Sequence, residues 1–183
     1  MDESPGAGSW LEMTIEENAI DYLEKSADFI QREDPYKWKW VSISLHAALY
    51  AFAICALRGT DPDRVTIGRK KRKLIDFPEA RERCQRDEYM LLYADSKTLV
   101  LSKDEEKAID KIGQALRNNF IHFSPKLWFI ETSGMPLIVK HCCRVVRFLV
   151  FESGNVRLNG DEKRIRIQSA LSILENAGAA VPH

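Results

Sequence analysis

Residues 102–125, SKDEEKAIDKIGQALRNNFIHFSP, have the start, the apolar face and the end of one amphipathic helix. Ser102 with Glu105 three residues later predicts a capping box, and the acidic first turn suits the positive end of the helix dipole. Pro125 predicts the end, because the residue before a proline avoids helical backbone angles. Apolar residues recur between these signals at spacings of three and four, which predicts one buried stripe; they are Ile109, Ile112, Leu116, Phe120 and Phe123.

The opposite face of this helix is polar. At about 100° per residue, Lys111, Gln114, Asn118 and His122 fall on one side. Asn118 and His122 are four residues apart and are therefore expected to be neighbours. Arg117 lies on the flank of the same face, and its long side chain can bend toward the histidine. The sequence therefore predicts a guanidinium, an amide and an imidazole together at one helix end.

The run RNNFIH places four residues between Arg117 and His122. It resembles the R-x4-H motif of HEPN domains, which are small helical bundles and in many cases metal-independent ribonucleases. Further helices are expected over about residues 14–31, 34–58, 74–93, 135–152 and 161–176, and their order around the motif is also similar to the family. The resemblance implies an all-α, up-and-down helical bundle of roughly five or six helices. This HEPN-like domain would span residues 14–177, between an N-terminal tail, 1–13, and a C-terminal tail, 178–183.

By this resemblance, Arg117 and His122 are the catalytic pair and Asn118 is their polar neighbour. The implied reaction is attack of an RNA 2′-hydroxyl on its own 3′ phosphate, which needs a base, an acid and positive charge on the phosphate. Imidazole is the side chain that suits proton transfer near neutral pH, and guanidinium binds phosphate oxygens in pairs. No metal or other cofactor is expected. The family commonly works as a homodimer, in which two His122 side chains would divide the acid and base roles.

The resemblance also implies partners, namely RNA, a second copy of the chain and, for a toxin or phage-defence component, a cognate antitoxin or nucleotidyltransferase. One HEPN subgroup has a tyrosine two residues after the histidine, which the nucleotidyltransferase modifies. Ser124 occupies that position here and argues against this regulation. The alternative function is a non-catalytic helical module that dimerises or binds a protein or nucleotide. In that case Arg117 pairs with an acidic residue and His122 caps helix carbonyls.

The densest positive charge lies in a predicted loop that begins at Gly59. A basic run there is predicted to bind RNA phosphates or to act as a nuclear localisation signal, with a solvated loop as the alternative; it consists of Arg69, Lys70, Lys71, Arg72 and Lys73. The formal net charge of the chain is +0. Nucleic-acid binding must therefore come from a local patch and not from a global basic excess.

The 183 residues are 45% hydrophobic and 30% charged, which indicates one soluble domain with a sizeable core. Residues 40–57 contain no charged side chain but do contain Ser42, Ser44 and His46, so a buried central helix is predicted there and not a membrane span. His46 is interpreted as a packing residue.

Four cysteines without a CxxC spacing, and an N-terminus without the pattern of a signal peptide, favour a reducing, cytoplasmic location. His141 stands beside Cys142 and Cys143, but adjacent helical residues point about 100° apart and cannot converge on one metal ion.

Overall fold

The computed structural model describes residues 10–68, 73–122, 125 and 127–177, and these form an all-α helical bundle. Its α-helices are α1 (Ile15–Ile30), α2 (Lys37–Arg58), α3 (Phe77–Cys84), α4 (Asp87–Met90), α5 (Lys103–Asp110), α6 (Asn118–Ile121), α7 (Met135–Arg147) and α8 (Asp161–Asn176). Two π-helical segments continue them: η2 (Lys111–Arg117) joins α5 to α6, and η3 (Phe148–Glu152) extends α7. The 3-10 turn η1 (Pro62–Val65) leads into a small antiparallel hairpin of β1 (Thr66–Ile67) and β2 (Lys73–Leu74).

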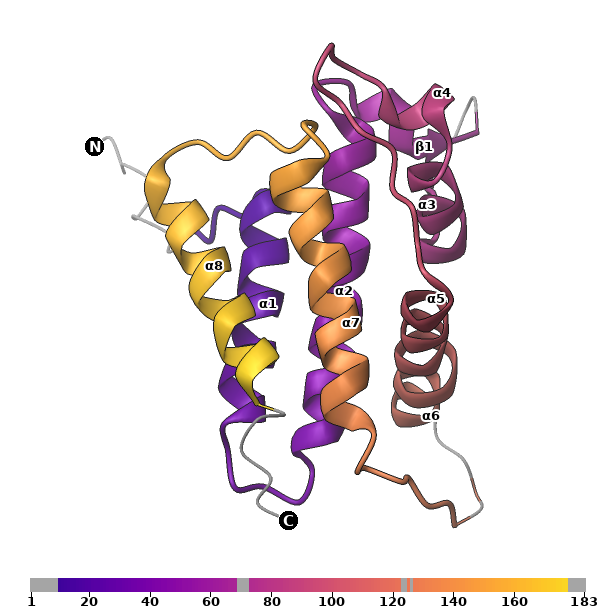
Figure 1. The fold of residues 1–183 in the computed structure, drawn as a ribbon, viewed down its shortest axis with the longest axis vertical. Coiled ribbons are helices and arrows are strands. Elements are labelled where there is room, and N and C mark those ends of the chain that lie inside the picture. Colours follow the sequence, from indigo (N-terminus) through magenta and orange to yellow (C-terminus); the bar gives the residue numbers. More distant parts are fainter. Residues whose placement is uncertain (1–9, 69–72, 123–124, 126, 178–183) are drawn as a thin grey trace, which may run out of the picture.

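The long helix α2 runs through the middle of the bundle (Figure 1). Helices α1 and α8 lie on one side of α2 and α7, and α3 and the α5–η2–α6 helix lie on the other (Figure 1). Because neighbouring helices cover α2 on several sides, its apolar residues extend nearly all the way around it. Most of its large apolar side chains are buried, among them Val41, Leu45, Leu49, Phe52 and Leu57, whereas Trp38 is half-buried.

Helix α2 is also long and apolar enough to cross a membrane when judged by length and composition alone, with a mean hydropathy of 1.8. In the bundle, however, 67% of its most apolar window is buried, as in the core helix of a helical protein. That this chain does not enter a membrane stays a prediction.

The predicted helix start at Ser102 is confirmed, and Thr14 caps the start of α1 with one of the two bonds of a capping box. The Ser102 Oγ accepts the Glu105 N–H at 3.3 Å, and the Glu105 carboxylate accepts the Ser102 N–H at 2.8 Å, which completes the capping box. The Thr14 Oγ1 likewise accepts the Glu17 N–H at 3.1 Å. The Glu17 carboxylate instead binds Lys163 at 2.8 Å and Arg166 at 3.0 Å, so it attaches α1 to α8.

The single helix predicted over residues 74–93 is wrong. Leu74 pairs with Thr66 in the hairpin, and α3 starts only at Phe77, after Asp76. The Asp76 Oδ1 accepts the Glu79 N–H at 3.0 Å, and Pro78 occupies the first turn, so the chain has its own start signal here. The helix stops at Cys84, and one further turn, α4, follows. The cap at Asp76 places Phe77 beside α2.

Helix α7 does not bury every apolar side chain that it carries. Leu137 is 60% exposed, whereas Val139, Cys142 and Val146 are fully buried. Helix α7 packs against α2, α5 and α8, so its buried face is broader than one stripe. The four cysteines are buried and unpaired, and burial raises the pKa of the Cys84 thiol to about 12.

Candidate functional site

The predicted 102–125 helix contains the π-helical segment η2. Its backbone hydrogen bonds run from i to i+5, so the turn is wider than an α-helical turn and shifts the faces that follow it. Gln114, Arg117 and Asn118 line one pocket together with Asp110 and Gly113, whereas Lys111 and His122 do not. Two members of the predicted polar face therefore lie outside this pocket.

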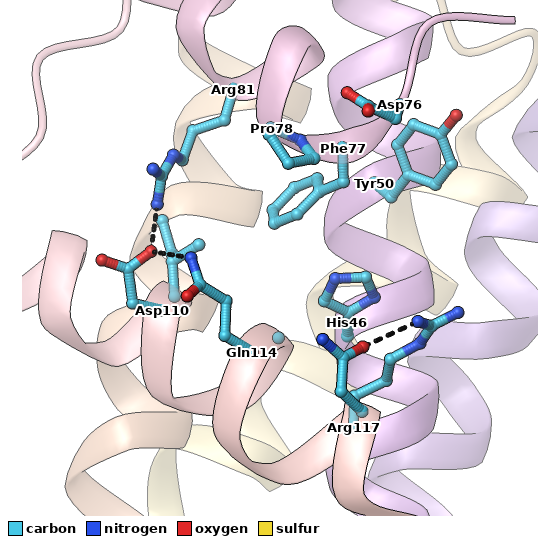
Figure 2. A pocket seen from close by; sticks show the side chains of 12 residues that line it. His46, Tyr50, Asp76, Phe77, Pro78, Arg81, Asp110, Gln114 and Arg117 are labelled. Carbon is cyan, nitrogen blue, oxygen red and sulfur yellow. Dashed lines mark hydrogen bonds and ion pairs between the residues drawn. The ribbon is translucent and has the colours of Figure 1, made fainter. Parts of the chain in front are cut away.

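This pocket lies between α2, α3 and the α5–η2–α6 helix and encloses about 340 Å³ (Figure 2). That volume is at the lower end of the range found for small-molecule sites. Three elements contribute aromatic, amide and charged side chains to its wall. The lining residues are His46, Tyr50, Asp76, Phe77, Pro78, Arg81, Ile109, Asp110, Gly113, Gln114, Arg117 and Asn118.

Of the two arginines that line this pocket, Arg117 is the one without a carboxylate partner among the described residues. Its Nη1 donates to the Asn118 Oδ1 at 2.9 Å, and no carboxylate in the described part of the chain forms an ion pair with it. The other arginine, Arg81, donates to Asp110 at 2.6 Å on the far wall of the pocket (Figure 2). Asp76 is occupied as the cap of α3. An anion entering the pocket would therefore meet a guanidinium with free N–H donors.

His46 projects from α2 into the same pocket, beside Arg117 (Figure 2). Its ring contacts Phe77 edge to face, with the centroids 4.7 Å apart. A Cβ atom on Gly113 would lie 3.0 Å from the His46 Cδ2 and 3.2 Å from its Nε2. The absence of a side chain at Gly113 thus allows the π-helical backbone to pack directly against the imidazole.

The charge of His46 is set by this packing. Burial lowers the pKa of the His46 imidazole to about 4, and the positive charge of Arg117 adds to the effect. The ring is therefore neutral at neutral pH. The sequence predicts only a packing role for His46. Two sequence signals could have indicated a site here, namely a histidine on the otherwise apolar helix α2 and a glycine, Gly113, within the amphipathic 102–125 helix.

We expect stability to fall as the pH is lowered from about 6.5 to about 4. Across that window the unfolded chain binds a proton at His46 and the folded protein does not, so stability rises with pH. The expected loss is about 1–2 kcal/mol, since the ring is only half-buried. Urea unfolding at both ends of the window measures it. In His46→Gln the loss across this window should shrink, and an unchanged loss would contradict the assignment.

His122 lies apart from the pocket. It is the exposed C-cap of α6, and its backbone N–H donates to the Asn118 carbonyl at 2.9 Å. Of the three residues expected to act together, the structure brings Arg117 and Asn118 into one pocket and leaves His122 at the open helix tip. Phe123, predicted to belong to the apolar stripe, and Ser124, at the position of the modified tyrosine in one HEPN subgroup, lie outside the described residues.

The basic run is described only at Lys73. Arg69, Lys70, Lys71 and Arg72 lie outside the described residues, and Lys73 is exposed in β2, where it pairs with Ile67. Lys73 does not line the pocket that contains Arg117.

A larger cavity of about 720 Å³ lies beside the C-terminal end of α2. Its cations are partly neutralised, because Arg58 pairs with Glu16 and Lys163 pairs with Glu17. Within the described residues, no group of three or more His, Cys, Asp or Glu side chains is arranged to hold a metal ion.

Comparison of the chain with protein-family models, curated proteins and solved structures finds no match. Fold and pocket define it as an all-α bundle with a half-buried histidine and an uncompensated arginine in one small pocket. Membership of the HEPN family stays a prediction from the motif.

Proposed function

We propose that this protein is a metal-independent endoribonuclease of the HEPN type, possessing Arg117, Asn118 and His122 as site residues. The observation that carries the proposal is the uncompensated guanidinium of Arg117 in an open pocket, held by its hydrogen bond to Asn118. A guanidinium in this state can bind the two non-bridging oxygens of a phosphodiester. A role as toxin or phage-defence component follows from the family resemblance alone.

In the proposed reaction the 2′-oxygen of RNA forms a bond to phosphorus and the bond to the 5′-oxygen breaks. A base removes the proton of the 2′-hydroxyl, and an acid gives a proton to the departing 5′-oxygen. The products are a 2′,3′-cyclic phosphate and a 5′-hydroxyl. Arg117 stabilises the negative charge that grows on the phosphate oxygens. His122, at an exposed helix tip, is free to reach a substrate or a second copy of the chain in a homodimer.

The second candidate is a non-catalytic module that binds a nucleotide. The position of His122 outside the Arg117 pocket favours it, because a binding site needs the cation and the pocket but no histidine at the tip.

Incubation of the purified protein with RNA in excess EDTA tests the proposal. We expect fragments that end in a 2′,3′-cyclic phosphate and a 5′-hydroxyl, formed at the same rate with and without EDTA. RNA that stays intact at high protein concentration would contradict the endoribonuclease and favour the binding module. Size-exclusion chromatography with light scattering tests the homodimer.

A further inference from the structure

Two groups in the Arg117 pocket have hydrogen-bonding capacity that the described part of the chain leaves unused. The His46 imidazole makes no hydrogen bond to any residue that the structure describes, although it is half-buried, and Arg117 uses only its bond to Asn118. The remaining charges of the wall are engaged elsewhere, Arg81 with Asp110 and Asp76 with the start of α3. A free guanidinium beside a free imidazole is the donor and acceptor set that a phosphate ester with an adjacent hydroxyl satisfies.

We propose that His46 and Arg117 together form the phosphodiester site of this protein, and that His46 is the base that removes the proton of the 2′-hydroxyl. This inference rests on the proposed ribonuclease function and adds a catalytic residue that the motif does not contain. Asn118 orients the guanidinium, and Gly113 leaves the space in which the imidazole stands.

The proton balance of the step is closed. The His46 imidazole, neutral at neutral pH, accepts the 2′-hydroxyl proton while the 2′-oxygen bonds to phosphorus. The 5′-oxygen leaves with the electron pair of its bond to phosphorus and takes a proton from His122, which reaches it from the exposed tip of α6 or from a second copy of the chain. The base and acid roles thus belong to two different histidines. Release of the His46 proton to solvent and uptake of a proton from solvent by His122 together restore the starting state.

Binding of the phosphate should change the basicity of His46. In the free protein the ring faces the Arg117 cation, while the nearby Asp76, Arg81, Asp110 and Tyr50 lie on the remaining walls. A bound phosphate anion would offset the positive charge of Arg117. The pKa of His46 would then rise toward the range in which an imidazole exchanges protons efficiently.

An NMR titration of the His46 ring tests the site without any turnover. The probe is a deoxydinucleotide monophosphate, which has the phosphodiester but lacks the 2′-hydroxyl and cannot be cleaved. We expect the titration midpoint of His46 to move from about pH 4 to above about pH 5 when the probe is present. In Arg117→Gln the probe should leave the midpoint unchanged. A midpoint that does not respond to the probe in the native protein would overturn the proposal.

Cleavage assays on variants supply the second readout. His46→Gln should cleave RNA at least about 100-fold more slowly than the native protein. Gly113→Ala should also lose cleavage, because its Cβ would displace the ring, while the matched control Gly134→Ala, whose Cβ has no neighbour closer than 3.7 Å, should not. Melting temperatures at neutral pH identify any variant that fails to fold, and the NMR titration on the native protein does not depend on them.

The two proposals fail differently. If the native protein cleaves RNA and folded His46→Gln cleaves equally fast, the role of His46 is wrong and the ribonuclease stands. If the native protein leaves RNA intact but the probe shifts the His46 midpoint, the ribonuclease is wrong and the phosphate site stands as a binding site.

Discussion

Arg117→Ala should reduce the rate of RNA cleavage by about 100- to 1,000-fold, which is the usual effect of removing one group that stabilises developing negative charge. The loss should be large because no other cation of the pocket is free, since Arg81 is held by Asp110 at 2.6 Å. Single-turnover rates measured at saturating protein report the chemical step directly. Arg117→Lys keeps the charge but loses the paired N–H donors, so we expect it to recover only part of the rate.

The matched control is Arg144→Ala, which removes an exposed arginine of α7 that does not line the pocket. It should cleave RNA at the native rate. Equal losses in both variants would mean that Arg117 acts only through the general charge of the surface. The corresponding pair for the amide is Asn118→Ala and its exposed neighbour Asn119→Ala, of which only the first should slow cleavage.

Leu45→Ala should lower the free energy of unfolding by about 2–5 kcal/mol. Leu45 is fully buried in α2, the helix that α1, α3 and α7 all contact, so the cavity left behind cannot be filled by solvent or by collapse of one neighbour. Urea unfolding, with the slope compared between the variants, measures the loss.

Leu137→Ala is the control for that substitution, because it removes the same atoms from a leucine that is 60% exposed. Its expected effect is within about 0.5 kcal/mol. Similar losses at the two leucines would show that α2 is not the centre of the core.

Much of the fold could be predicted from local signals. The capping box at Ser102, the apolar stripe through Ile109, Ile112 and Leu116, and Gly59 at the end of α2 were all correct, because each depends on residues within a few positions. The helix predicted over residues 74–93 was wrong, because Leu74 instead pairs with Thr66, eight residues earlier, in the small hairpin.

The site was predicted only in part. Arg117 and Asn118 were singled out by the motif and do line the pocket. The π-helical turn within this helix was not expected, because its hydrogen bonds differ from the α-helical pattern without any distinct sequence signal. Leaving His46 out of the predicted site was the larger error. His46 and Arg117 are 71 positions apart in the sequence, and they come together only because α2 packs against η2.

The amino-acid sequence by itself determined that this chain forms helices, where most of them start and stop, and which one is apolar enough to be central. These properties follow from hydrogen bonding and hydrophobic period within a single segment. Only the tertiary structure decided which histidine stands beside Arg117, and which arginine keeps a free charge. Those facts depend on how three helices from distant parts of the chain pack, and on whether a carboxylate from another helix, such as Asp110, reaches the guanidinium.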